Sequence, residues 1–127
     1  MADYTVAKIP EMEPFYKGLF LRARGALDVK SFGMAVVEMP AGFADYPDHD
    51  HPDQEEVYVV LSGTGTLELE NGDSVPLDPE TMVRVGPNTK RKITSETDMR
   101  LLALGGVPGQ AYDAPDYTEP GAPDPLA

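Results

Sequence analysis

The sequence predicts a single all-β domain built from short strands. With 127 residues and a mass of 13.7 kDa, the chain is long enough for one ordinary domain and too short for two. Hydrophobic residues make up 41% of the chain, which is enough for one packed core. The 13 prolines and 12 glycines together form about a fifth of the chain, against an average share of ~12%. Breaks at that frequency exclude long helices and favour short strands joined by tight turns.

The first thirty residues predict little regular structure. Only residues 13–26 could form a helix, but Gly18 and Gly25 interrupt the periodicity, so a strand or coil is equally expected there. The segment is nevertheless rich in apolar side chains that need a covering surface, namely Ile9, Phe15, Tyr16, Leu19, Phe20 and Leu21. That surface is either the chain's own domain or a second subunit. We therefore expect residues 1–30 to be an N-terminal extension, and we predict a homodimer.

From Ser31 onward the pattern is typical of β-structure. Apolar and β-branched residues recur in short runs, some of them with strict alternation of polar and apolar side chains. Asn71-Gly72 between two such runs is a strong hairpin signal, and Pro87-Asn88 favours another turn. Short strands at this spacing indicate a sandwich or a barrel. The predicted strands are residues 32–39, 56–61, 66–70, 74–77, 82–85, 91–94 and 99–104.

The end of the sequence predicts an irregular tail over residues 106–127. Residues 105–127 contain five prolines, four glycines and four acidic residues, and no lysine or arginine follows Arg100. This composition is typical of an extended segment that crosses a surface or stays mobile. Tyr112 and Tyr117 could attach parts of it to the domain. The domain itself is then expected over residues 31–105.

Charge and cysteine content exclude several classes of partner and cofactor. The chain has 22 acidic and 10 basic residues, a net charge of −12, which repels nucleic acid and anionic membrane surfaces. The absence of cysteine excludes disulfides, iron–sulfur clusters and thiolate zinc sites. The sequence begins without a pattern typical of a secretory signal and has no apolar run of ~18 residues, so a cytoplasmic protein is expected.

Metal-ligand chemistry is indicated by the only two histidines, His49 and His51. Two residues apart on an extended chain, both imidazoles face the same side. If the connection to Glu56 turns the chain back, this carboxylate completes a two-histidine, one-carboxylate face. Such a face leaves coordination positions open and suits Fe, Mn, Zn or Ni. The alternative is that the histidines in this acidic loop are only solvated partners of aspartates.

The surroundings of these residues favour the metal. Gly42 precedes His49-Asp50-His51, four residues separate His51 from Glu56, and six separate Glu56 from Gly63. This resembles the first motif of the cupin superfamily, G-x5-HxH-x3-4-E-x6-G, with one extra residue after Gly42. The resemblance covers about residues 30–105. It implies a double-stranded β-helix, the cupin or jelly-roll barrel, with a site inside its mouth.

Arg91 is where the sequence departs from the family pattern. In the second cupin motif a histidine, the fourth metal ligand, follows a turn; here Asn88 stands at the usual glycine and Arg91 at the histidine. Arginine has no lone pair to offer a metal. Either the metal remains and Arg91 docks an anionic ligand, or Arg91 pairs with Glu56 and replaces the metal's charge. A slip of one residue would instead turn Lys90 or Lys92 inward.

Two hypotheses for function follow from the resemblance. In the first, the protein binds a small, oxygen-rich or anionic molecule at a divalent metal, as a dioxygenase or an isomerase does, with Arg91 contacting the ligand. In the second, it is a metal-free, non-catalytic binding or sensory module in which Arg91 is paired with Glu56. Tyr58, two residues after Glu56, should share its inward face and offer the ligand a phenol, or simply fill the core. Whether the protein is an enzyme stays open.

Overall fold

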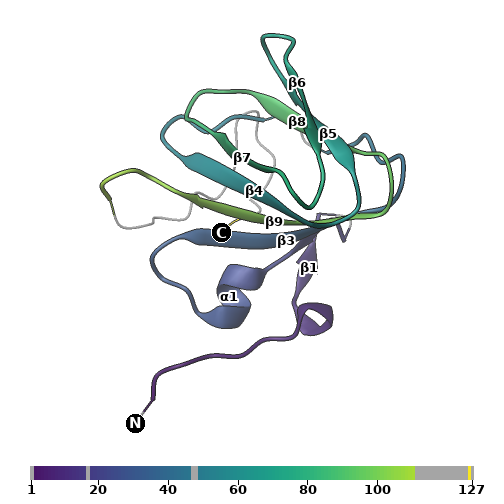
Figure 1. Ribbon diagram of the computed structural model, residues 1–127. Coiled ribbons are helices and arrows are strands. Elements are labelled where there is room, and N and C mark those ends of the chain that lie inside the picture. Colours follow the sequence, from purple (N-terminus) through teal and green to yellow (C-terminus); the bar gives the residue numbers. More distant parts are fainter. Residues whose placement is uncertain (1, 17, 47–48, 111–125, 127) are drawn as a thin grey trace.

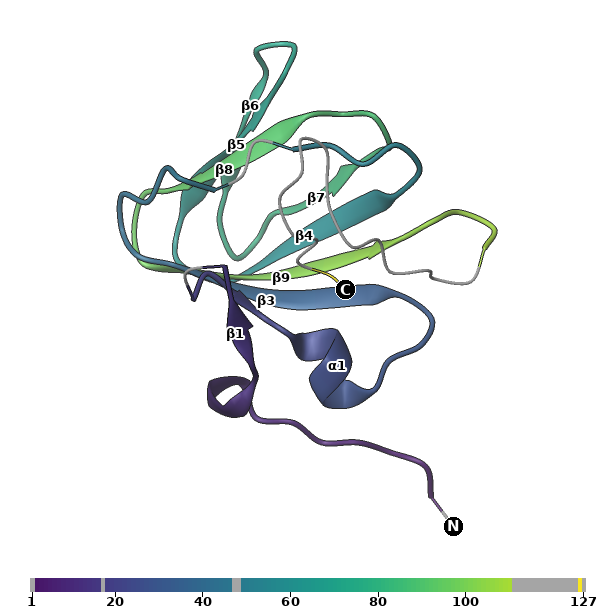
Figure 2. The ribbon, with the colours of Figure 1, turned by 180° about the vertical axis from the view of Figure 1, so that it is seen from behind.

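The computed structural model describes residues 2–16, 18–46, 49–110 and 126. The described residues form nine strands in two antiparallel sheets, with one short α-helix and one turn of 3-10 helix. One sheet has the order β1-β2-β3-β9-β4-β7, and the other has the order β6-β5-β8. Figure 1 shows the smaller sheet facing the central strands of the larger one, and Figure 2 shows the same two layers from behind. The predicted cupin-type barrel is confirmed.

Each strand expected from Ser31 onward is present, with bounds that differ from the predicted ones by at most two residues at either end. Gly63 and Gly72 break the chain between successive strands with positive φ angles of 84° and 92°. The Asn71-Gly72 turn joins β5 to β6 as the hairpin signal predicts, because the two strands are antiparallel partners. The seven strands are β3 (Gly33–Met39), β4 (Glu55–Ser62), β5 (Gly65–Leu69), β6 (Ser74–Leu77), β7 (Met82–Val85), β8 (Arg91–Ser95) and β9 (Met99–Gly106).

The N-terminal segment contains two short strands and a helix. The 3-10 turn Ile9–Glu11 is followed by β1 (Pro14–Phe15), β2 (Phe20–Leu21) and α1 (Ala23–Leu27). The helix therefore occupies only the end of the range considered for it, because the chain turns at Gly18 (φ 76°) and pairs β1 with β2. Strand β2 then pairs with β3, so that β1 becomes the edge strand on this side of the large sheet. No helix among the described residues is long and apolar enough to cross a membrane.

The apolar side chains of this segment are mostly covered by the chain itself. Leu19 and Phe20 lie in the main core, and Phe15 and Tyr16 pack against it. On the opposite side of the large sheet, a second cluster contains Leu21 together with Met12, Ala23 and Val36, and Ile9 packs against that cluster. Figure 1 shows α1 beside β3, outside the barrel.

The barrel interior follows from strand parity. Along β4, Glu56, Tyr58 and Val60 are buried, whereas the residues between them are half-buried. Their partners on β9 are Gly105, Ala103 and Leu101, which face the same side. Because alternate residues share a face, Glu56 is placed at one end of the interior and Val60 deeper along the strand. The predicted position of Tyr58 on the inward face with Glu56 is confirmed.

The predicted tail lies mostly outside the described residues. The structure does not describe residues 111–125 and 127, which include Tyr112 and Tyr117. Leu126 is described: it is fully buried and belongs to the main core, and its carbonyl oxygen accepts a hydrogen bond from Met34 N at 3.2 Å.

Candidate metal centre

His49 and His51 precede β4 and are held by backbone hydrogen bonds to the segment around Asn88 and Arg91 rather than by a regular strand. His49 and Arg91 form an isolated antiparallel bridge, with N···O distances of 3.0 and 2.9 Å. Asn88 N donates to His51 O at 2.7 Å. Asn88 can make this turn because its φ of 58° is left-handed, a conformation that asparagine tolerates better than most residues. The turn before β8 therefore positions both histidines against the barrel.

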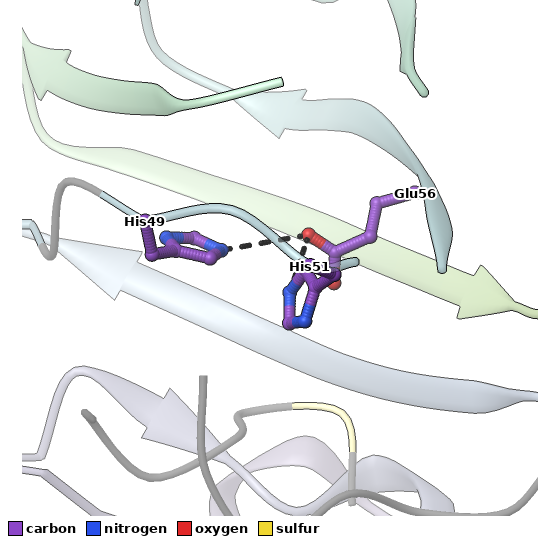
Figure 3. A group of neighbouring side chains, drawn as sticks. All are labelled: His49, His51 and Glu56. Atoms are coloured by element: carbon purple, nitrogen blue, oxygen red, sulfur yellow. Dashed lines mark ion pairs between the residues drawn. The ribbon is translucent and has the colours of Figure 1, made fainter. Parts of the chain in front are cut away.

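The three predicted ligands converge inside the protein. Nε2 of His49 lies 3.6 Å from Oε1 of Glu56, and Nε2 of His51 lies 3.5 Å from the same oxygen. One nitrogen or oxygen atom from each residue lies within 4.8 Å of the others, and the three residues are 1–2% exposed. Figure 3 shows both imidazoles directed toward the carboxylate. The half-buried Asp50 between the histidines points elsewhere, as the alternation requires.

Arg91 is the inward residue of the Lys90-Arg91-Lys92 run. Arg91 has no exposed surface, whereas Lys90 is exposed and Lys92 is half-buried. The slip of one residue that would turn a lysine inward is therefore absent. The guanidinium forms an ion pair with Glu56 through Nη2. It also donates hydrogen bonds from Nε to the Tyr58 hydroxyl at 3.1 Å and from Nη1 to Thr89 O at 2.9 Å.

Glu56 is the common partner of this network. Its Oε1 accepts a hydrogen bond from Tyr58 OH at 2.8 Å and forms the ion pair with Arg91. Its Oε2 accepts one from Gln54 Nε2 at 3.3 Å. Three side chains and two histidine rings thus surround a single buried carboxylate. Such a carboxylate is stable in an apolar interior only if its charge is compensated and its lone pairs are used.

The electrostatics define the protonation states of Glu56, Tyr58 and Arg91. Burial alone would raise the pKa of Glu56, but its interactions with His49 and His51 and the charge of Arg91 outweigh burial and hold that pKa well below its ordinary value of 4.5. Burial and the charge of Glu56 raise the pKa of Tyr58 well above 10.0. Burial acts to lower the pKa of Arg91, but Tyr58 and Glu56 raise it above its usual value. At neutral pH the site contains a carboxylate, a guanidinium and a neutral phenol.

The arrangement fits a metal ion in its donor set and nearly in its spacing. Metal bonds to imidazole nitrogen and carboxylate oxygen are about 2.0–2.2 Å long, so two donors on one ion lie roughly 3–3.5 Å apart. The histidine nitrogens are 3.5 and 3.6 Å from Oε1, close to that range. The charge of Arg91 acts in the other direction, because it already balances the carboxylate and repels a second cation. His49, His51 and Glu56 could therefore hold a divalent ion, with Arg91 lowering its affinity.

Comparison with known proteins agrees with the fold. The Cupin domain family matches residues 35–105, more than half of the sequence, and the chain belongs to this family. A cupin protein from Bacteroides fragilis has a similar structure, with 22% identity over 89% of this chain and 92% of that one and a TM-score of 0.71. No match is found among curated proteins.

Two further solved structures share the fold. A cupin superfamily sugar phosphate isomerase from Silicibacter pomeroyi has 21% identity, covers 78% of this chain and 67% of that one, and has a TM-score of 0.61. A Streptomyces protein solved with uridine has 22% identity, covers 83% and 80%, and has a TM-score of 0.62. At these identities the likeness concerns the fold alone.

Sequence reasoning missed two members of the site. Gln54 lies in the connection between His51 and Glu56. It precedes the inward-facing Glu56 by two residues, so strand parity predicts that it also faces inward and could have identified it. Thr89 contributes only its backbone carbonyl, which no side-chain pattern reveals. A surface hollow of about 400 Å³ near Met39 and Met99 lies at the opposite end of β9 and has none of the three predicted metal ligands in its lining.

Proposed function

We propose that this protein binds a divalent metal ion and a small oxygen-rich molecule inside the barrel, with His49, His51 and Glu56 as the protein ligands of the metal. The observation that carries the proposal is the approach of both Nε2 atoms to a single buried carboxylate oxygen, at 3.6 and 3.5 Å. Two imidazoles and one carboxylate leave coordination positions open, and Fe, Mn, Zn and Ni all accept this set. Once bound, such an ion supplies a Lewis acid to a ligand oxygen.

The protein's own contribution is to hold Glu56 charged and correctly oriented. Tyr58 and Arg91 both donate hydrogen bonds to Oε1, and Gln54 donates to Oε2. Residues that orient a ligating group in this way raise the precision of a metal site. All three contacts of Arg91 lie within the protein, so we infer that it acts on a ligand through Glu56 and Tyr58. Direct docking of an anion on Arg91, as the sequence suggested, requires it to give up one of these bonds.

A second candidate function is metal-free ligand binding, and the Arg91–Glu56 ion pair favours it. In that case the guanidinium supplies the counter-charge that the carboxylate needs, and the protein is a non-catalytic binding or sensory module. The two candidates differ in one measurable property, which is whether the protein contains stoichiometric metal when it is purified without chelator and without a metal-affinity tag.

Elemental analysis combined with two variants tests the proposal. We expect wild type to contain about one divalent ion per chain, His51→Ala to contain none, and Asp50→Asn, the matched change at the neighbouring half-buried position, to keep full occupancy. Added metal should raise the melting temperature of wild type and Asp50→Asn and leave His51→Ala unchanged. Full occupancy in His51→Ala would contradict the ligand assignment. Metal-free wild type that also fails to bind added Mn²⁺ or Zn²⁺ would support the second candidate.

We also propose a homodimer and a cytoplasmic location. The large apolar side chains that remain exposed include Tyr4 (78%) and Val6 (77%) near the N-terminus and Met82 (73%) on β7. Exposed apolar surface of this kind favours contact with a second copy. Light scattering at micromolar concentration should give twice the chain mass of 13.7 kDa. A single species of monomer mass would refute the dimer.

A further inference from the structure

Gln54 carries a buried acceptor atom that the folded chain leaves unused. The residue is only 3% exposed, and its Oε1 has no hydrogen-bond partner among the described residues. Buried side-chain oxygens are rarely left without a donor, because the cost of removing them from water is then not recovered. An unused acceptor next to a candidate metal centre therefore indicates a group that is added when the site is occupied.

The orientation of this amide is imposed by Glu56. The carboxylate forms an ion pair with Arg91 and accepts hydrogen bonds, so Gln54 presents its amide nitrogen to Oε2, at 3.3 Å. Reversing the amide would place two acceptors against each other. Because Oε1 and Nε2 share one carbon atom, the acceptor is held beside the carboxylate and directed away from it.

Gln54 lies at one end of the barrel interior. A Cβ atom at Gly105 would lie 3.1 Å from Gln54 Nε2 and 2.5 Å from Cδ1 of Leu126, so a glycine there leaves the space that these two side chains occupy. Gly105 pairs directly with Glu56 across β4 and β9. Gln54 is thus next to the carboxylate on the side where Leu126 closes the interior.

The other polar groups at this end are already used. Arg91 donates to Glu56, Tyr58 and Thr89, and the Tyr58 hydroxyl donates to Glu56. Neither group is free to receive a ligand without breaking an internal bond. The available recognition element is therefore an acceptor, which selects a ligand that carries a donor.

We propose that Gln54 is a specificity-determining residue whose Oε1 accepts a hydrogen bond from a hydroxyl group of the bound molecule, so that the site takes polyhydroxylated rather than purely anionic compounds. This inference rests on the proposed function, since it places the hydroxyl beside the metal ligands. A ligand molecule that carries a carboxylate but no hydroxyl group should bind poorly, because it offers Gln54 Oε1 no hydrogen-bond donor.

The test uses three full-length proteins: wild type, Gln54→Met, and Gln110→Met. Methionine is close to glutamine in size and removes the acceptor, and the exposed Gln110 is the matched control. Each protein is titrated first with Mn²⁺, then with xylitol and with acetate, with chemical shifts as the readout for the metal-free protein and calorimetry for the metal-loaded one. We expect Mn²⁺ affinity to be equal in wild type and Gln110→Met and lower in Gln54→Met, because this variant also loses the hydrogen bond that Gln54 Nε2 donates to Glu56 Oε2; the ligand titrations therefore use saturating Mn²⁺. Xylitol should bind at least tenfold more weakly to Gln54→Met than to the other two, and acetate should not discriminate among them.

Acetate separates recognition from a structural role. Gln54→Met also removes the bond to Glu56 Oε2, so its unfolding constant in urea should rise, by roughly fivefold or more. If that loss merely distorted the site, xylitol and acetate would weaken by the same factor, and this result would overturn the proposal. Equal xylitol affinity in wild type and Gln54→Met, or no xylitol binding to wild type, would also overturn it. If wild type fails to bind Mn²⁺ but its affinity for xylitol still depends on Gln54, the proposed metal site is wrong and the proposed role of Gln54 stands.

Discussion

At position 91 the chain has an arginine whose side chain is entirely enclosed by the barrel and whose backbone is bridged to His49. Its guanidinium forms an ion pair with Glu56, beside His49 and His51. A permanently charged cation there balances the carboxylate, and the same cation opposes a divalent ion. If the centre binds metal as proposed, Arg91 should lower its affinity.

Replacing Arg91 with histidine should strengthen metal binding. Arg91→His removes the repelling charge and adds a nitrogen donor next to the other two imidazoles. We expect the affinity for Zn²⁺ or Mn²⁺ to rise by about tenfold or more if the repulsion is worth ~1–2 kcal/mol. Competition titration with a chromophoric chelator measures the change. Arg84→His, at an exposed arginine that pairs with Glu55, is the control and should leave the affinity as it is. An unchanged affinity in Arg91→His would remove Arg91 from the centre.

The contribution of Glu56 to stability should depend on pH. Burial alone would raise its pKa, but His49, His51 and Arg91 hold it well below 4.5 in the folded protein, so the folded state favours the carboxylate more than the unfolded state does. This stabilisation is fully present above the ordinary pKa and is lost as the pH falls through the folded-state value. In chelator, the difference in unfolding free energy between wild type and Glu56→Gln should be constant from pH 7 to about 5 and shrink below pH 4.5. Urea unfolding across this range measures it, and a constant difference down to pH 3 would contradict the lowered pKa.

At the scale of the elements, glycines at strand ends decide how closely neighbouring segments approach. Gly63 follows β4 with φ at 84°, and a Cβ atom there would lie 2.0 Å from Asp98 O and 2.8 Å from Met99 Cα. Gly72 in the β5–β6 turn has a similar φ of 92° but open space around it. Gly72 is therefore favoured by its backbone conformation alone, whereas Gly63 is favoured both by its backbone conformation and by the lack of room for a side chain.

Gly63→Ala should therefore destabilise the protein much more than Gly72→Ala. Gly72→Ala costs only the unfavourable backbone conformation, roughly 1–2 kcal/mol. Gly63→Ala adds a clash with backbone atoms that cannot rotate away, and we expect it to exceed Gly72→Ala by more than about 1.5 kcal/mol. Urea unfolding of both variants at pH 7 measures the two costs. Equal costs would mean that the β4–β5 turn relaxes freely away from the start of β9.

At the scale of the whole molecule, residues far apart in the sequence close the barrel. Leu126 is completely buried in the main core, accepts a hydrogen bond from Met34 on β3, and meets the space left by Gly105 on β9. Its side chain therefore completes the same interior that contains Glu56. A residue so late in the chain contributes to the core as the strands do.

Leu126→Ala should cost about 2–5 kcal/mol of unfolding free energy, the range for deleting a buried leucine side chain. Leu61→Ala, at a leucine that is 46% exposed near the end of β4, is the matched control and should stay within about 0.5 kcal/mol of wild type. Urea unfolding at pH 7 decides the matter. A cost for Leu126→Ala as small as that of the control would show that Leu126 is not part of the core in solution.

What the sequence by itself determined was local. Strand positions were predictable because alternation and turn residues act over a few neighbours, and the family resemblance supplied the barrel into which they fit. The inward positions of Glu56 and Tyr58 followed from the same parity. The early segment was not predictable, because Phe20 and Leu21 form a strand only by pairing with Val37 and Val36 of β3.

Only the tertiary structure decided the chemistry around Glu56. The sequence left open whether Arg91 or a neighbouring lysine points inward, since parity on β8 depends on the register that the β5 pairing and the His49 bridge impose. It did not show the closure by Leu126, because Leu126 and the strands that it contacts are far apart in the chain. It did not show the bond from Gln54 to Glu56 either, because parity gives the face on which Gln54 lies and not the atom that it contacts. A sequence pattern can place a side chain on a face of its own strand, whereas the partner across the barrel depends on how the sheets close around the core.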